Sequence, residues 1–298
     1  MKFILYFLFL FFSVSMGGIG WWLERKLTAR FQYRVGPPWY QNFIDIMKLF
    51  IKETIIPQGA SRILFILSPL VSLSSSLIVA LILITDYFFK QNFIADIIVI
   101  IYLLIIPSLF LILGAFSSAN PLALVGAIRE TKQLIAYEFV FIVSLVIVII
   151  KTGGSLFLSE IIERQMLGNI YFKSFSGLIA FILAFFYLQA KLGIIPFDTP
   201  EAEQEIASGV MIEYSGALLG FWKISKLLLY FSLPLFIIFL FLPGKFVDII
   251  IKYFLLILLI TVVKNINPRM RIKDVLEFFW FFLFPLGLIG IFLAINGY

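Results

Sequence analysis

Cysteine and histidine are both absent from the 298-residue sequence, and charged residues make up only 13% of it. The chain therefore lacks the usual protein ligands of haem, iron–sulfur clusters and most zinc sites, and it can form no disulfide. Imidazole acid–base chemistry and thiol nucleophiles are excluded as well, so proton handling falls to Asp, Glu, Lys, Tyr or water. We expect this chain to bind no metal and to carry no catalytic centre of its own.

Hydrophobic residues, in contrast, make up 62% of the sequence, and Phe alone occurs 36 times. Apolar runs repeatedly reach the roughly 20 residues that a helix needs to cross a hydrocarbon core. These runs are apolar all round rather than alternating with polar residues, which excludes a transmembrane β-barrel. The composition predicts an all-α polytopic membrane protein with a single membrane domain over residues 1–298.

Eight transmembrane helices are predicted from these runs, and an even number puts both termini on one side of the membrane. The expected ranges are 3–22, 62–85, 96–115, 131–150, 176–195, 212–241, 246–264 and 277–296. A further, amphipathic helix is expected at 41–53, because apolar residues recur there at helical spacing opposite Gln41, Asp45, Lys48 and Lys52. It should lie along the membrane surface or beneath a partner.

Lys and Arg are concentrated in the connections that follow the first, third and fifth predicted spans and in the one that precedes the eighth. By the positive-inside rule these connections are cytoplasmic and both termini lie outside a prokaryotic cell membrane. Topology explains the net charge of +6, so no nucleic-acid partner is expected.

The segment 196–216, here called the acidic loop, holds five of the seventeen acidic residues of the chain. These are Asp198, Glu201, Glu203, Glu205 and Glu213. A membrane protein holds such a cluster only where water, cations or a partner protein compensate it. We expect Asp198 or Thr199 to cap a helix with Pro200 in its first turn, which would put Glu201 and Glu205 on one face. A solvated loop and a functional site explain the cluster equally well.

Three ionisable residues are expected inside the bundle. Glu138 lies about two turns inside the fourth predicted span, where it either holds a neighbouring helix through a basic partner or relays a proton. Lys223 and Lys226 share one face of the sixth span and should point into the bundle, with snorkelling to the interface as the alternative. The sequence contains no phosphate-binding Gly-rich loop, nucleophile elbow or metal-ligand spacing, so a free-standing enzyme is not expected.

An ordered series of motifs runs through most of the chain. It consists of Glu24, Arg25 and Lys26 with Gln32, Arg34, Val35, Gly36 and Pro37; Asp45, Lys48, Leu49, Lys52, Glu53 and Pro57; Gly126, Ala127, Ile128 and Arg129 before Gln133, Tyr137 and Glu138; PFDTPEAEQE with Glu213 and Tyr214; and Asn267, Pro268, Arg269, Met270 and Arg271. Together these segments resemble the H subunit of respiratory complex I and its relatives in membrane-bound hydrogenases and sulfur reductases.

The resemblance implies an ion pump driven by electron transfer, in which this subunit anchors a peripheral redox arm on its cytoplasmic face. Implied partners are hydrogenase-like large and small redox subunits, antiporter-like membrane subunits and ferredoxin. Iron–sulfur clusters would lie in those partners, as would a nickel–iron centre in a hydrogenase. The implied ion-coupling residues are Glu138, Asp198, Glu201, Glu203, Glu205, Glu213, Lys223 and Lys226. The implied docking residues are Arg25, Lys26, Arg30, Arg34, Arg129, Arg269 and Arg271.

One departure from the family pattern selects among its members. Quinone-reducing members usually carry a Glu-Tyr pair where this chain has Lys226 and Leu227. An acid has become a base, which favours a ferredoxin-fed hydrogenase or sulfur reductase and leaves the quinone-reducing H subunit as the alternative. A stand-alone secondary ion transporter is a third hypothesis, although no inverted repeat supports it. Both H⁺ and Na⁺ are compatible with the sequence as the transported ion.

Overall fold

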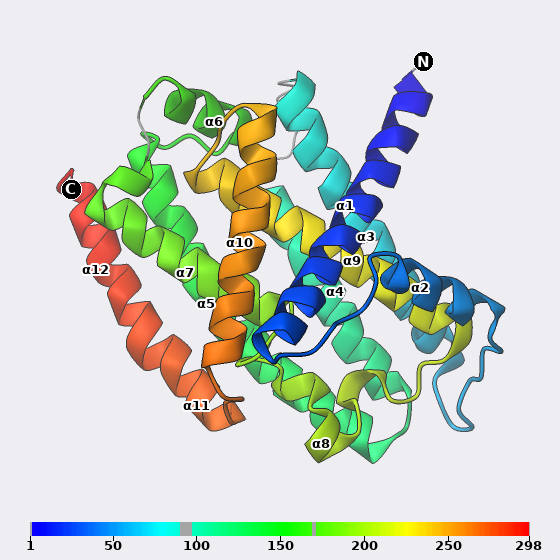
Figure 1. Cartoon of the computed structure of the whole chain (residues 1–298). Coiled ribbons are helices and arrows are strands. Elements are labelled where there is room, and N and C mark those ends of the chain that lie inside the picture. The colour runs from blue at the N-terminus through cyan, green and yellow to red at the C-terminus, as the bar shows by residue number, and fades with distance from the viewer. Residues whose placement is uncertain (1, 90–96, 169–170, 298) are drawn as a thin grey trace.

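The computed structural model describes residues 2–89, 97–168 and 171–297, and every regular element in them is helical (Figure 1). Within these residues, seven helices are long and apolar enough to cross a membrane. They are α1 (Lys2–Phe31), α3 (Arg62–Phe89), α4 (Ile97–Ser117), α5 (Pro121–Lys151), α9 (Gly216–Phe241), α10 (Phe246–Ile266) and a continuous segment made of α11 (Ile272–Glu277), a π-helical stretch (Phe278–Leu283) and α12 (Phe284–Ile295). The prediction of an all-α polytopic membrane protein is confirmed.

The predicted number of eight long spans is corrected to seven, because the segment expected at 176–195 is shorter. It forms α7 (Phe175–Lys191), an apolar helix of 17 residues. The hydroxyl of Ser174 caps its start by accepting a hydrogen bond from the Gly177 N–H at 3.2 Å. Shortly after its end, Gly193 adopts φ +61°, a left-handed conformation that favours glycine and stops the helix.

The last membrane segment begins at Ile272 rather than at 277, and two further differences in helix starts change where candidate site residues lie. Helix α5 starts at Pro121 rather than at 131, because Asn120 caps it by accepting a hydrogen bond from the Leu122 N–H at 2.8 Å. Helix α9 starts at Gly216 rather than at 212, and Gly216 has φ +56°. A side chain at Gly216 would also lie 2.6 Å from the Glu53 carbonyl oxygen. These boundaries put Arg129 on a helix and leave Glu213 in the loop before α9.

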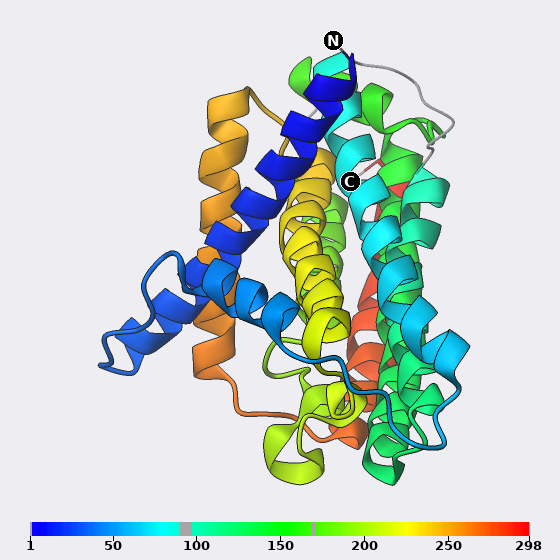
Figure 2. The same cartoon turned by 90° about the vertical axis from the view of Figure 1, so that its right-hand side faces the viewer.

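The amphipathic helix is confirmed as α2 (Gln41–Ile51), which ends two residues before the predicted boundary and crosses α1 and α9 (Figure 2). Its buried Asn42 holds it to α1, donating to the Gly18 carbonyl at 3.1 Å and accepting from Arg25 at 2.7 Å. On the opposite face Met47 and Ile51 are exposed. An exposed apolar face on a short helix is typical of a segment that lies in the membrane interface.

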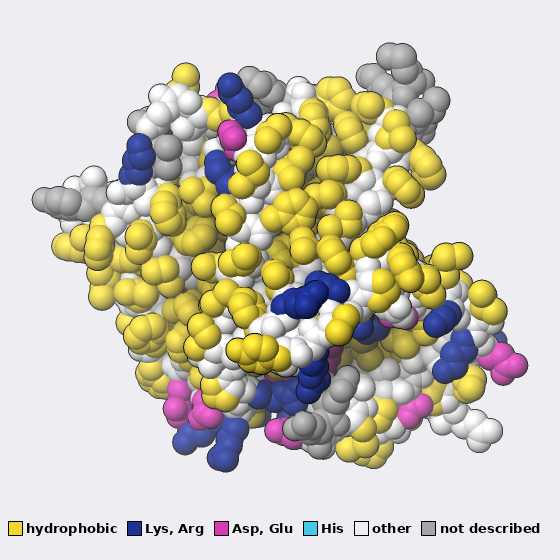
Figure 3. Space-filling model, viewed as in Figure 1, with side chains coloured by type: hydrophobic (Ala, Val, Ile, Leu, Met, Phe, Trp, Pro, Cys, Tyr) yellow, Lys and Arg dark blue, Asp and Glu magenta, His cyan; other side chains and the backbone are white. Residues whose placement is uncertain are grey.

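Helix α9 forms the centre of the bundle, and 89% of its most apolar stretch is buried. The acidic loop emerges at one end of the bundle with its short helices η2 (Thr199–Glu201), α8 (Glu203–Ile206) and η3 (Gly209–Met211). Helix α11 lies at the same end, and α6 (Leu158–Met166) lies at the opposite one (Figure 1). Charged side chains gather near α2 and α11 and also near α6, and mostly hydrophobic ones cover the middle of the same face (Figure 3).

Candidate functional site

The acidic loop does not form the single capped helix that the sequence suggested. Asp198 precedes the 3₁₀ turn η2 but makes no capping hydrogen bond with its side chain. Glu201 ends η2, whereas Glu205 belongs to α8, so the two carboxylates do not share a helix face. The prediction of a shared face was wrong, because the backbone changes direction at Ala202 between the two short helices (ψ 96°).

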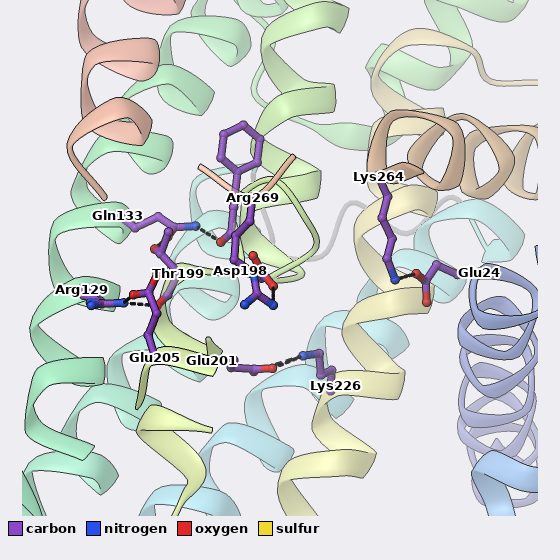
Figure 4. A network of polar contacts seen from close by, with 11 residues as sticks. Glu24, Arg129, Gln133, Asp198, Thr199, Glu201, Glu205, Lys226, Lys264 and Arg269 are labelled. Carbon is purple, nitrogen blue, oxygen red and sulfur yellow. Dashed lines mark hydrogen bonds and ion pairs between the residues drawn. The ribbon is translucent and has the colours of Figure 1, made fainter. Parts of the chain in front are cut away.

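Each of three loop carboxylates pairs with a different basic residue, and the three cations come from three separate helices or connections (Figure 4). Asp198 contacts Arg269 at 2.5 Å, Glu205 contacts Arg129 of α5 at 2.6 Å, and Glu201 contacts Lys226 of α9 at 3.0 Å. Basic residues of the chain therefore compensate three of the five acids of the loop. The side chain of Glu203 lies outside the described part of the structure.

Further hydrogen bonds and close packing hold the loop in place beside these ion pairs. Gln133 of α5 donates to the Phe197 carbonyl at 2.7 Å and accepts from the Thr199 hydroxyl at 2.7 Å (Figure 4). Met270, in the connection before α11, donates its N–H to the Pro196 carbonyl at 3.1 Å. Gly126 allows α5 to approach closely, because a Cβ there would lie 2.8 Å from the Val210 nitrogen. The loop is therefore fastened to α5 and to the α10–α11 connection.

Lys226 controls the charge state of Glu201. Its ammonium group donates to both carboxylate oxygens of Glu201, at 3.1 and 3.0 Å. Burial by itself would raise the pKa of Glu201, but the positive charges of Lys226 and Lys223 outweigh it and hold that pKa below its ordinary value. Glu201 is thus kept ionised by a cation on the central helix.

Glu201 and Lys226 open onto a hollow of about 60 Å³ between α3, α4, α5, α7 and α9, here called the central hollow. A single water molecule needs roughly 10–15 Å³ of such space, so the central hollow has room for several. Its polar lining is formed by Ser72, Ser108, Glu130, Lys191, Asp198, Glu201, Ser225 and Lys226. Both charge signs thus face one space that is large enough for water.

Glu130 lines the central hollow, although the sequence analysis did not select it. It is buried on α5, accepts a hydrogen bond from the Tyr137 hydroxyl at 3.3 Å, and lies within the electrostatic reach of Lys191 and Glu201. It was missed because the predicted helix began after it. The sequence signal was Asn120 followed by Pro121, a cap and first-turn pair that extends α5 across Glu130.

Glu138 lies two turns further along α5 and has a basic partner, as one of the two sequence hypotheses required. Lys191, at the end of α7, donates to Glu138 at 2.7 Å, and its side chain is fully buried. The same ammonium group lies 5.1 Å from the ring centre of Tyr137. Since Tyr137 also contacts Glu130, the groups from Glu201 through the central hollow to Glu138 form a continuous polar region.

Glu213 and Lys223 have surroundings that differ from those of the three loop pairs. Glu213 accepts a hydrogen bond of 2.5 Å from the side-chain amide of Asn120, next to the start of α5. Its neighbour Tyr214 is buried, and burial raises the pKa of the Tyr214 phenol to about 12, so the phenol stays neutral.

Lys223 lies 5.6 Å from the ring centre of Trp21, in a second hollow between α1, α2 and α9. Lys223 and Lys226 therefore face different spaces.

The basic residues expected at a docking surface also divide into two groups. Arg129 and Arg269 pair with the acidic loop, and Arg271 lines a hollow of about 250 Å³ with them. Arg25 contacts α2 instead, at 2.7 Å from Asn42 and 3.8 Å from Asp45. Within the described residues, no ion pair joins Lys26, Arg30 or Arg34 to the loop. Glu24 of α1 pairs with Lys264 of α10 at 2.5 Å, away from the loop (Figure 4).

No group of three or more Asp or Glu side chains in the described parts of the chain is arranged to hold a metal ion.

Comparisons with known proteins cover nearly the whole chain. The family model described as NADH dehydrogenase matches residues 3–295. The H subunit of NADH-quinone oxidoreductase from Geobacillus sp. (strain WCH70) is 32% identical over 290 residues, covering 91% of this chain and 86% of the relative. Its counterpart from Bacillus mycoides (strain KBAB4) is 32% identical with the same coverage.

A solved structure is similar over the same extent. A chain of the membrane-bound sulfane sulfur reductase, an archaeal respiratory membrane complex, matches with a TM-score of 0.88 and 27% identity, covering 98% of this chain and 99% of that one. The family matches confirm the resemblance seen in the motifs. This multi-pass membrane chain belongs to the NADH dehydrogenase family that contains the H subunits of complex I.

Proposed function

We propose that this chain is the membrane-anchor and coupling subunit of a ferredoxin-dependent, complex I-like hydrogenase or sulfur reductase. The observation that carries the proposal is the ion pair between Lys226 and Glu201 at the central hollow. Quinone-reducing members usually have an acid at the position of Lys226. A cation there changes the charge of the space next to the acidic loop and keeps Glu201 ionised.

The likeness to the sulfane sulfur reductase chain supports the same choice, because it extends over 98% of this chain. By analogy, a peripheral redox arm would dock at the end of the bundle that carries the acidic loop. Arg129, Arg269 and Arg271 border a hollow on that face and are the residues we assign to the contact. Arg25, Lys26, Arg30 and Arg34 would extend the basic surface beside α2. Positive charge on this face also agrees with a cytoplasmic orientation.

Ion coupling is assigned to the polar region between the loop and Glu138. Reduction of a docked arm would change the charge next to Glu201 and Glu205, and the change would reach Glu130 through the central hollow. Lys191 and Glu138 would carry it deeper into the bundle. In this scheme the lysines are fixed counter-charges, and the carboxylates gain or lose protons or attract cations. Redox centres would belong to the partner subunits.

The proposal is tested with the purified native complex that contains this chain. With reduced ferredoxin as the electron donor, we expect hydrogen or sulfide as the product and no reduction of a soluble quinone. Quinol formation without hydrogen or sulfide would overturn the proposal. Lys226→Glu should impair ion transport per electron, whereas Lys226→Arg, which keeps the cation, should retain it.

A second candidate is the H subunit of an NADH-quinone oxidoreductase, which the names of the 32% identical relatives favour. It predicts a quinone site between α2 and the acidic loop. A photoreactive quinone analogue should then crosslink to residues 41–51 or to the loop. Labelling of these residues that is prevented by excess quinone would support the second candidate over the first. Absence of such labelling would exclude the second candidate.

A further inference from the structure

Asp86 is a buried carboxylate at the end of the bundle opposite the acidic loop, in the last turn of α3. The residue is only 4% exposed, and its Oδ1 atom makes no hydrogen bond to any part of the chain that the structure describes. An ionised carboxylate that is buried without a partner is strongly unfavourable, and such a group becomes neutral or takes up a ligand. Asp86 thus differs from the loop carboxylates that pair with Lys or Arg.

A hollow of about 410 Å³ borders Asp86 and is lined by residues of α3, α6 and α10. Its lining includes Tyr87, Ser159, Glu163 and Phe246. The space exceeds that of one water molecule many times over, since a single water needs roughly 10–15 Å³. Asp86 is therefore shielded from bulk water but adjoins a space that water can fill.

Other titratable groups surround this end of α3. They are Tyr6 of α1, Tyr102 of α4, Lys151 at the end of α5, Glu160, Glu163 and Arg164 of α6, Lys245 before α10, and Asp248 and Lys252 in the first turns of α10. Several of the charged ones are engaged elsewhere. Glu160 accepts from Ser155 at 2.6 Å, and Arg164 donates to the Thr152 carbonyl. Lys252 donates to the Leu242 carbonyl at 2.8 Å and to the Pro243 carbonyl at 3.1 Å.

Two further neighbours of Asp86 also bond to other groups. Asp248 accepts from the Lys245 N–H at 3.3 Å, and the Tyr87 hydroxyl donates to the Gly244 carbonyl at 3.2 Å. Burial of Asp86 disfavours its ionised form. Deep burial, with no ion-pair partner among the described residues, points to a carboxylic acid that keeps its proton.

We propose that Asp86 is a proton-exchange site, protonated near neutral pH and in contact with water in the adjoining hollow. In the exchange, the O–H bond of the acid breaks, the proton passes to water, and the carboxylate is left until a proton returns. No oxidant or other reactant takes part. The site lies at the far end of the bundle from the acidic loop, so it extends the proposed function without depending on the electron acceptor.

The test is infrared difference spectroscopy of the purified complex in lipid, recorded between neutral and alkaline pH. We expect the C=O band of a protonated acid at neutral pH that shifts in D₂O and disappears as the pH rises. The band should be missing in Asp86→Asn and retained in Asp248→Asn, the matched control at an exposed carboxylate of α10. If Asp86→Asn does not assemble, ¹³C-labelled aspartate in the wild-type complex should shift the same band.

Three outcomes would overturn the assignment. The first is that neutral pH gives no acid band that depends on Asp86 or on the aspartate label. The second is a band that responds to neither D₂O nor pH, which would mean that the acid does not exchange its proton with water. The third is removal of the band by Na⁺ at constant pH, which would identify a Na⁺ site instead. None of these readouts uses ferredoxin, hydrogen or sulfide, so a failure here is distinguishable from a failure of the proposed function.

Discussion

Carboxylates at the two ends of the bundle differ in whether they have a basic partner. At the acidic loop, Asp198, Glu201 and Glu205 are each within 3.0 Å of a basic group. At the other end, Asp86 is more deeply buried than any of them and forms no ion pair with the described residues. Three acids of the dense cluster thus have a cationic partner, whereas the single acid in an apolar run has none among the described residues. The electrostatic free energy of an acidic segment therefore depends on whether each carboxylate has a cationic partner, and not on the number of carboxylates.

Removing the cation from the most buried pair should have the largest effect. Lys191→Met leaves the carboxylate of Glu138 buried without its partner, and breaking such a pair costs about 3–5 kcal/mol. We expect a large fall in the thermal stability of the purified complex. The double variant Lys191→Met/Glu138→Gln should recover much of the loss, because no unpaired charge remains. Equal destabilisation in the single and double variants would show that the ion pair is not the cause.

The pair at the central hollow should have an intermediate effect and a clear dependence on pH. Because Lys226 lowers the pKa of Glu201, the pair stabilises the fold above the ordinary carboxyl range. That stabilisation is lost as the pH falls through the lowered pKa. Lys226→Gln should cost about 1–2 kcal/mol near neutral pH, between the values for exposed and buried pairs.

The free energy of unfolding as a function of pH checks the prediction for Lys226. The difference between wild type and Lys226→Gln should shrink in acid, and Lys226→Arg should follow the wild-type curve. A difference that is constant down to strongly acidic pH would mean that Lys226 contributes through packing rather than through the charge of Glu201.

The exposed pair at the loop should matter less for stability. The side chain of Glu205 is 54% exposed, and such pairs contribute roughly 0–1 kcal/mol. We expect Glu205→Gln to destabilise the chain slightly in low salt and not at all in high salt, where charges are screened. Denaturation at two salt concentrations measures this. If the loop couples redox chemistry to transport, ions moved per electron should fall although stability does not.

Glu213→Gln should have the smallest effect on stability. The amide oxygen of Gln can still accept the hydrogen bond from Asn120, so a change below about 0.5 kcal/mol is expected. Ion transport by the reconstituted complex is the informative measurement. Wild-type transport would assign Glu213 a structural role at the start of α5, and reduced transport with normal assembly would place its negative charge in the coupling path.

Local sequence patterns predicted the helices better than they predicted contacts. Helical spacing of apolar residues identified α2, and long apolar runs identified the membrane helices. The span at 176–195 was predicted too long, because apolar Leu192, Ile194 and Ile195 flank the turn at Gly193 and hide the end of the helix. The start of α5 was missed because its first turns are not apolar enough to resemble a membrane span, and Glu130 was missed with it.

The pairing of charges could not be read from sequence. Asp198 and Arg269 are far apart in the chain, and only the folded bundle brings them together. Glu201 and Glu205 lie close in sequence but turn toward different helices. The sequence did predict that cations would lie near the loop, because acidic side chains in a membrane protein need compensation whichever residues supply it. The single membrane domain, the docking and coupling roles and the orientation in the membrane stay predictions.

The hydrogen bond between Met270 and Pro196 and the ion pair between Arg269 and Asp198 have a mechanical consequence. They join two connections, one that follows α7 and one that precedes α11, at neighbouring points. Two neighbouring attachments restrict both translation and rotation of one connection relative to the other, so we expect the two connections to move together. A partner protein that displaced either connection would then displace the ends of α7 and α11 at the same time.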